Sequence, residues 1–491
     1  MGRALSIFGG STPISNHMTE YSSDSFFGSD SAALQRFEQM IGNNDSYFFD
    51  VEELEAISEH YFGNGQHEKA RKAIDYGLQL YPDCNALLLK KAQALLIGSK
   101  PRKAMRILDF LEASEPGNTE LLLFKAVVHR NLSDHEGTKA CLMKALNSTT
   151  ENQEEIFLDL AFEQEMVNDY KGAIKSLKQS LRINPEYEPC LFELAYCYEM
   201  ADEIEEGIEF FKQFLDHQPY SYVAWYNLAI CYDRLGLWEL AINAVEYSLA
   251  IQEDFTNAHI LRGNLFGNCD KDALAIEAYR ESLIYDEQNP MVYSAIGECY
   301  ERLGASAQAE INYLRALSID NDYADALMGM GAVREGEGKL SEALEYYQKA
   351  LESDDGNIDI AHIYCETLVK MGMLTEARTR YLEMTERFVD DEESWIALAA
   401  LEHELQGASV AVHILQLAME HIPQSTDLVW HLIKYLCLDG KKVQAEELLS
   451  SSLQFQPKKA EYLKEIFPEV IEFSNLAAWL QGLQSEGEHE L

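Results

Sequence analysis

Hydrophobic and polar residues repeat along most of this chain with a period of about 34 residues. The stretch LAICYDRLGLWELAI, which begins at Leu228, combines small residues, a Cys-Tyr pair, an acidic residue and a Leu-Gly break. Near copies begin at Leu194, one period earlier, and at Ile296, two periods later. A regular period of this length predicts a tandem array of one structural unit in place of several unrelated domains.

A series of small residues fixes the register of the array. We number the positions of each unit as slots 1 to 34 and place this series at slot 20. With one residue inserted within 147–153, slot 20 holds Ala70, Ala104, Thr138, Ala173, Gly207, Ala241, Ala275, Ala309, Ala343, Ala377, Ala411 and Ala445. The units then begin at residues 51, 85, 119, 154, 188, 222, 256, 290, 324, 358, 392 and 426.

The apolar pattern within each unit predicts two helices of about a dozen residues joined by a short turn. Slots 4, 7, 8 and 11 are mostly apolar or small, a spacing that forms one face of a helix. In the unit that begins at 222 they hold Trp225, Leu228, Ala229 and Tyr232. Slots 20, 24 and 27 form a second apolar set after a break that often contains glycine. We expect the small residues at slots 8 and 20 to meet where the two helices cross closely.

This pattern resembles the tetratricopeptide repeat family. The shared features are the period, a Trp-x-x-Leu-Gly/Ala-x-x-Tyr first helix, alanine at slot 20, an aromatic residue at slot 24 and proline at slot 32. The chain departs from it at Thr138 and lacks the slot-32 proline at Thr150 and in the units that span 222–391. The resemblance covers residues 51–459, about twelve repeats, and implies an all-α fold, a right-handed superhelical α-solenoid.

The two ends of the chain differ from the array. Residues 1–30 are rich in Ser, Gly and Asp, and we expect them to be disordered. Residues 31–50 are expected to form an N-terminal capping helix, and residues 460–483 to form C-terminal capping helices, because a repeat array must cover its terminal apolar faces. Residues 484–491 are expected to be an acidic tail.

Charge limits the classes of partner. The formal net charge is −44, so nucleic acid is not expected as a partner and a membrane is an unlikely one. No apolar run is long enough to span a bilayer, and the N-terminal apolar run is too short for a secretory signal, which predicts a cytoplasmic protein. Gly2 fits the formal myristoylation pattern, but a single acyl chain without a polybasic segment anchors only marginally.

No pattern predicts catalysis, a cofactor or a metal site. The glycine cluster at 329–338 lacks a preceding strand, and the calcium-like segment from Asp320 has Asp325 where the loop needs glycine. His403 has no second histidine at the metalloprotease spacing. Three of the nine cysteines occupy one slot of the repeat, which predicts apolar packing. We therefore expect a protein that is not an enzyme.

A second face of the first helices is the candidate protein-binding site. Slots 5, 9 and 12 lie about one residue's rotation from the core face, and the family resemblance implies that they line the concave side. They carry an aromatic and aliphatic stripe beside carboxylates: Leu158, Phe162, Glu165, Phe192, Tyr196, Glu199, Tyr226, Ile230, Asp233, Ile260, Glu298 and Glu301. Two interpretations remain open, burial of this stripe against neighbouring helices or exposure in a groove that binds a peptide.

The main functional hypothesis is a non-catalytic protein-protein interaction scaffold or assembly adaptor. Its concave groove would hold a peptide or helix with apolar anchors and basic residues. One alternative is a regulatory or targeting subunit of a separately encoded enzyme. Another is a solenoid that self-associates through its open ends. The family's co-chaperone members grip a free carboxylate with concave Lys and Asn, whereas here slot 5 has no Lys and slot 9 has Asn only at Asn264.

Overall fold

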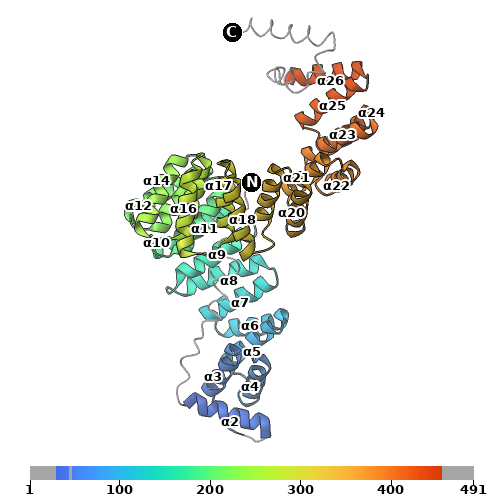
Figure 1. Cartoon of the computed structure of the whole chain (residues 1–491). Coiled ribbons are helices and arrows are strands. Elements are labelled where there is room, and N and C mark those ends of the chain that lie inside the picture. Colours follow the sequence, from blue (N-terminus) through green and yellow to red (C-terminus); the bar gives the residue numbers. More distant parts are fainter. Residues whose placement is uncertain (1–28, 44–46, 456–491) are drawn as a thin grey trace. The chain divides into compact units, whose positions relative to one another are not determined.

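The computed structural model describes residues 29–43 and 47–455 (Figure 1). In these ranges the chain forms 25 α-helices and no strand, so the fold is an all-α solenoid of tandem helix-turn-helix units. Most of the predicted disordered segment 1–30 lies outside the described residues. The predicted capping helices 460–483 and the acidic tail 484–491 lie outside them entirely.

The chain divides into two compact units, residues 1–269 and 270–491, which are described separately. The helices of the first unit are α2 (Ser29–Asn43), α3 (Val51–Gly63), α4 (His67–Leu80), α5 (Asn85–Ile97), α6 (Pro101–Ser114), α7 (Thr119–Asn131), α8 (His135–Ser148), α9 (Gln153–Met166), α10 (Tyr170–Ile183), α11 (Glu188–Met200), α12 (Ile204–His217), α13 (Tyr222–Arg234), α14 (Trp238–Ile251) and α15 (Thr256–Asn268). Those of the second unit are α16 (Asp272–Tyr285), α17 (Pro290–Arg302), α18 (Ser306–Ile319), α19 (Ala324–Gly336), α20 (Leu340–Ser353), α21 (Ile358–Lys370), α22 (Leu374–Arg387), α23 (Glu392–Gln406), α24 (Ala408–His421), α25 (Thr426–Leu438) and α26 (Lys442–Phe455).

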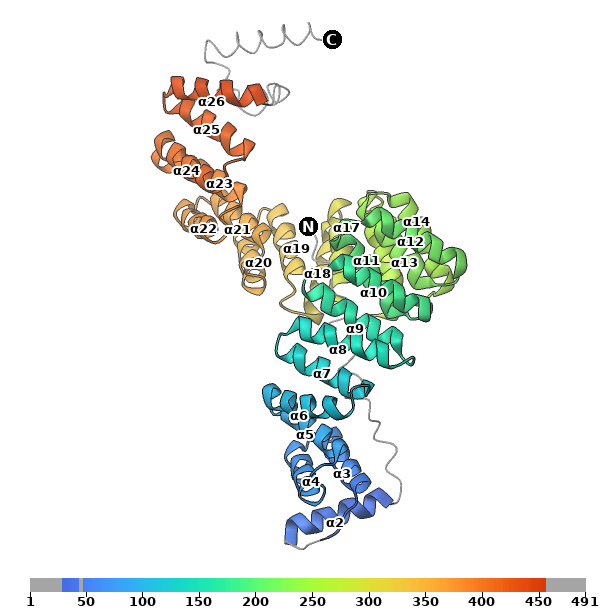
Figure 2. The same ribbon diagram turned by 180° about the vertical axis from the view of Figure 1, so that it is seen from behind.

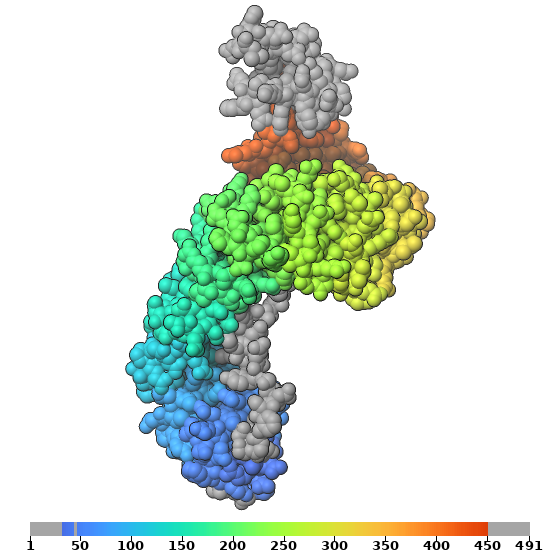
Figure 3. Space-filling view, turned by 90° about the vertical axis from the view of Figure 1, so that its left-hand side faces the viewer, coloured from blue at the N-terminus to red at the C-terminus, as the bar shows by residue number. Residues whose placement is uncertain are grey.

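Within each unit, successive helices pack against one another in chain order (Figure 2). In the space-filling view, the repeats of the first unit follow one another from blue to green as a continuous stack (Figure 3). Most first helices of a repeat are as long as α13 and most second helices are one residue longer, like α14. Helix α9 is a first helix with the greater length, so the residue inserted within 147–153 extends the start of this helix.

The turn between the two helices of a repeat requires a left-handed residue. Gly236, between α13 and α14, has φ +69°. Glycine adopts this conformation without a Cβ clash, and short polar residues tolerate it. Other repeats use glycine, serine, asparagine or aspartate at the same slot, all with positive φ: Gly65, Ser99, Ser133, Asn168, Asp202, Asp270, Gly304, Gly338, Gly372 and Gly440.

Close contact between the two helices explains the small residues at slots 8 and 20. Ala229 on α13 and Ala241 on α14 are both fully buried. In two repeats of the second unit, slot 24 holds tyrosine and slot 8 holds glycine in place of a larger residue. A Cβ on Gly297 would lie 2.5 Å from the Tyr313 ring, and one on Gly331 would lie 2.3 Å from a Tyr347 ring atom. The crossing therefore has room for one bulky residue beside two small ones.

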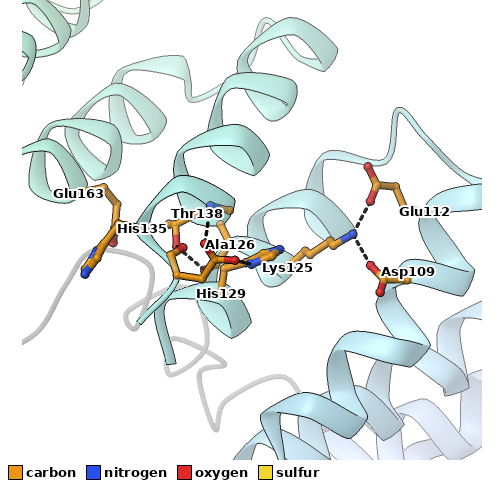
Figure 4. Close-up of polar contacts among 10 residues, drawn as sticks. Asp109, Glu112, Lys125, Ala126, His129, His135, Thr138 and Glu163 are labelled. Atoms are coloured by element: carbon orange, nitrogen blue, oxygen red, sulfur yellow. Dashed lines mark hydrogen bonds and ion pairs between the residues drawn. The ribbon is translucent and has the colours of Figure 1, made fainter. Parts of the chain in front are cut away.

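Thr138 shows how the crossing tolerates a departure from alanine (Figure 4). Its side chain is fully buried. Its hydroxyl oxygen lies 3.0 Å from the Asp134 carbonyl oxygen and 3.4 Å from the carbonyl oxygen of Ala126, the slot-8 residue of the same repeat. The buried hydroxyl therefore has a carbonyl acceptor, and this hydrogen bond offsets the loss of its contact with water.

Slot 7 is mostly apolar, as predicted, but two N-terminal repeats have lysine there. Lys125 holds this slot on α7, is 9% exposed, and points to two carboxylates of α6 (Figure 4). Its Nζ lies 2.5 Å from Asp109 and 2.6 Å from Glu112. Lys91 on α5 likewise lies 3.2 Å from Asp75 of α4. A buried lysine is stable here because the preceding helix pairs its charge.

Replacing Ala241 by leucine should overpack the crossing and lower the free energy of unfolding by about 1–3 kcal/mol. The matched control is Ala250→Leu, which places the same side chain on the exposed face of the same helix. Chemical denaturation followed by circular dichroism would compare the two variants with the wild type. Equal stability of all three would show that the assigned crossing is wrong.

Candidate protein-binding face

The twelve residues expected on the binding face are divided between the two compact units. The ten from Leu158 to Ile260 lie on α9, α11, α13 and α15 of the first unit. Glu298 and Glu301 lie on α17 of the second unit. Because the two units are separate bodies, these are two groups, and the first carries all of the apolar stripe. We call the ten residues of the first unit the central face.

The slot-5 row of the central face is largely buried. Leu158 is fully buried and Tyr226 is 5% exposed, while Phe192 and Ile260 are half-buried. Leu158 and Tyr226 belong to the main apolar core of this unit, and Phe192 packs against it. Burial against neighbouring helices therefore describes most of the slot-5 row. We call it the inner row because it lies beneath the surface.

A residue that the sequence analysis missed holds the inner row together. Phe255 lies just before α15, and its ring centroid is 4.9 Å from that of Tyr226 and 6.4 Å from that of Phe192. Tyr222 contacts Phe255 at 5.1 Å, with the rings nearly perpendicular. Edge-to-face pairs of this kind add to the free energy gained from burial alone.

Phe255 occupies slot 34, which in several other repeats holds a polar residue that caps the next helix. The side chains of Asn118, Ser221 and Asn289 accept a hydrogen bond from the first turn of the helix that follows. Phe255 and Tyr187 make no such cap. A lost cap costs about 0.5–2 kcal/mol. Tyr187 and Phe255 lack the free energy that a cap would add, but both pack against the core beside the central face.

The slot-9 row is more accessible. Tyr196 is 37% exposed, and Phe162 and Ile230 are half-buried. The ring of Tyr170, from the start of α10, meets that of Tyr196 edge to face at 6.2 Å. The slot-5 row is therefore largely buried and the slot-9 row is more accessible, although both lie on one face.

The slot-12 carboxylates bond to the following repeat. Glu199 on α11 lies 3.0 Å from Arg234 on α13. Asp233 on α13 accepts a hydrogen bond of 3.2 Å from the Asn268 amide on α15. In each case the donor occupies slot 13 of the next repeat. These pairs link adjacent first helices along one edge of the central face.

Glu165 is the exception in this row. The next slot 13 holds Met200, which offers no cation, and the neighbouring polar contact is the Cys197 thiol at 3.2 Å. Burial raises the pKa of Glu165 to about 7, and the nearby Glu193 carboxylate adds to the rise. Burial also raises the pKa of Glu193. The central face thus contains a carboxyl group whose ionised form a nearby cation would stabilise.

Glu298 and Glu301 form a smaller acidic group on the second unit. Glu298 is exposed, and Glu301 accepts a hydrogen bond from the Tyr313 hydroxyl. Desolvation by the surrounding protein raises the pKa of both carboxyl groups. Glu335, one repeat later, pairs with Lys370 at 2.7 Å, which repeats the link from slot 12 to slot 13.

Neither a metal centre nor a membrane span is found in the part of the chain that the structure describes. No group of three or more His, Cys, Asp or Glu side chains there could hold a metal ion. None of the helices described above is long and apolar enough to cross a bilayer. The nine cysteines, all in described residues, form no disulfide.

Three models of the tetratricopeptide repeat match the chain, at residues 190–219, 292–323 and 335–401. Tetratricopeptide repeat protein 14 of Mus musculus is 29% identical over 125 residues, which are 26% of this chain and 15% of that protein. Protein O-mannosyl-transferase TMTC1 of Homo sapiens is 24% identical over 163 residues, 32% of this chain and 18% of that protein. A chain of the APC/C hetero-tetramer Cut9-Hcn1 aligns with TM-score 0.41 and 14% identity, covering 83% of this chain and 93% of that one. The chain spans less than a fifth of the length of the curated relatives it matches.

Replacing Glu165 by glutamine should stabilise the protein increasingly as pH rises from about 4.5 to 7. The folded-state pKa is raised above the unfolded value of 4.5, so the wild type loses stability as the carboxyl group ionises across this window. The gain of the variant should reach on the order of 1–3 kcal/mol above pH 7. Denaturation curves at several pH values would measure it.

The control for this experiment is Glu199→Gln. It removes a carboxylate that pairs with Arg234, so we expect no gain in stability from this change. The same pH profile for both variants would contradict a special environment at Glu165.

Proposed function

Because the chain is a tetratricopeptide repeat protein of about twelve tandem repeats, we propose that it is a non-catalytic interaction scaffold or assembly adaptor that binds a peptide or helix on its central face. The ligand would carry apolar anchors for the slot-9 row and lysine or arginine for the neighbouring carboxylates. Tandem repeats of this family support a role in protein-protein interaction.

The observation that carries the proposal is the position of Glu165 beside the exposed side chain of Tyr196, with the half-buried Phe162 one turn earlier on the same helix. Accessible apolar side chains next to one another on a protein surface commonly mark an interaction site. The titratable groups that act on this carboxyl group within the described residues include Glu193, Cys197 and Tyr196, and none of these three is a cation. A partner ammonium or guanidinium group would stabilise the ionised form of Glu165, while the apolar row supplies contact area.

The proposal also predicts how pH acts on binding. A basic ligand favours ionised Glu165, so its affinity should rise as pH increases from about 5 to 8. The other titratable groups that face this carboxyl group are Glu193, Cys197 and Tyr196. Burial raises the pKa of Cys197 and Tyr196 well above this window, so they stay neutral, whereas Glu193 acts in the same sense as Glu165.

Tyr196→Ser should weaken partner binding by about ten-fold or more, since it removes an accessible anchor at the centre of the face. The matched control is Tyr220→Ser, an equally drastic change at a tyrosine that is 82% exposed before α13, outside the face. Affinity capture from lysate at low and moderate salt, with mass spectrometry, would name the captured protein. Titration with that protein would then give the affinity of each variant.

The proposal requires a captured protein whose binding segment is basic and apolar. It also requires that Tyr196→Ser loses this protein and that Tyr220→Ser retains it. Equal capture by both variants, or a captured segment without basic residues, would contradict binding on the central face.

A further inference from the structure

A second surface of the first unit differs from the acidic remainder of the chain. Lys100, Arg102, Lys103 and Arg106 lie close together in sequence, at the turn before α6 and along its first two turns. All four residues are exposed. No ion pair or side-chain hydrogen bond to any of them occurs within the described residues. We call these four residues the α6 cluster.

Four exposed cations within residues 100–106 stand out in a chain with so large an excess of acidic residues. Acidic residues outnumber basic ones by 83 to 39, so carboxylates are plentiful. Other cations of the same unit use them: Lys91 bonds to Asp75, Lys125 to Asp109 and Glu112, and Lys144 to Glu112. The fold therefore pairs much of the nearby positive charge between repeats and leaves the α6 cluster to the solvent.

The helix places an apolar side chain beside these charges. Arg102, Arg106 and Phe110 follow one another at i, i+4 and i+8, which puts them on one face of α6. Phe110 is 61% exposed. Asp109 also lies near this face, but Lys125 engages its carboxylate at 2.5 Å. The face thus combines available cations with an apolar anchor.

We propose that the α6 cluster binds a short acidic polypeptide segment that carries an apolar residue. Carboxylates of the segment would pair with the arginines and lysines, and its apolar residue would cover Phe110. This surface is separate from the central face and has the opposite charge preference, so the inference does not depend on the proposed function of that face.

The size of the cluster favours a short peptide over a longer polyanion. From Lys100 to Arg106 the helix rises by about 9 Å, the length of roughly three residues of extended chain. Duplex DNA carries a negative charge about every 1.7 Å along its axis and would continue past the cluster. An anionic bilayer extends further still. With a net charge of −44, this chain repels a polyanion that reaches beyond the local cations.

The test uses the full chain and a fluorescein-labelled synthetic peptide of six glutamates with one central leucine. Fluorescence anisotropy at low salt would measure its affinity for the wild type, for R102Q/R106Q and for K175Q/R182Q. Lys175 and Arg182 are exposed on α10, have no ion pair within the described residues, and give a control with the same change in net charge. We expect at least a ten-fold loss for R102Q/R106Q and less than a two-fold change for the control.

Two further measurements separate this site from general electrostatics. F110S should weaken peptide binding about three-fold or more without any change in net charge, and circular dichroism should show wild-type helicity for all variants. Equal losses in the two double variants, no loss with F110S, or no binding by the wild type would overturn the proposal. Tighter binding of duplex DNA or of phosphatidylserine vesicles than of the peptide would also overturn it.

Discussion

The close crossing of two helices within each repeat is the constraint on which the rest of the structure depends. The backbones approach so closely that slots 8 and 20 must hold small side chains, as Ala229 and Ala241 do. The glycines opposite Tyr313 and Tyr347 show that the available volume is fixed and that a larger neighbour must be offset by a smaller one. Because this crossing occurs once in each repeat, the sequence has a regular period.

The crossing also determines which faces of the first helices remain for other roles. With slots 4, 7, 8 and 11 turned to the core, slots 5, 9 and 12 present three parallel rows on an adjoining face. The slot-5 row is held by the aromatic residue before the next helix, as Phe255 holds Tyr226. The slot-12 row bonds to slot 13 of the next repeat, as Glu199 bonds to Arg234. The slot-9 row lies between them and keeps an exposed tyrosine, Tyr196.

Periodicity was enough to predict the helix pairs, the turns and the small residues at the crossing, because these depend on residue size and spacing within one repeat. It was not enough to predict Lys125 in a core slot, since its stability depends on Asp109 and Glu112 of the preceding helix. Nor could amphipathic spacing separate the buried Tyr226 from the exposed Tyr196, because both lie on the same face of a first helix. Tyr226 packs against Phe255, which occupies a slot that holds a polar cap in several other repeats. The sequence does contain some information on polar contacts between repeats, in the spacing from slot 12 of one repeat to slot 13 of the next. At this spacing Asp233 bonds to Asn268 and Glu335 bonds to Lys370. Aligning the repeats by slot would have shown that Met200 breaks this series and offers Glu165 neither a cation nor an amide at slot 13 of the following repeat.

The same reasoning identifies where charge can act on other molecules. In a repeat array each unit contacts mainly its neighbours, so an ionic group that finds no partner in the next helix has few others within the chain. Many charges of the first unit are used in pairs between adjacent repeats, such as Lys91 with Asp75. Glu165 and the α6 cluster are two departures of opposite sign, one a carboxyl group and the other a group of exposed cations. Binding would bring each the counter-charge that the adjacent repeats do not provide, which is the physical basis for treating both surfaces as interaction sites.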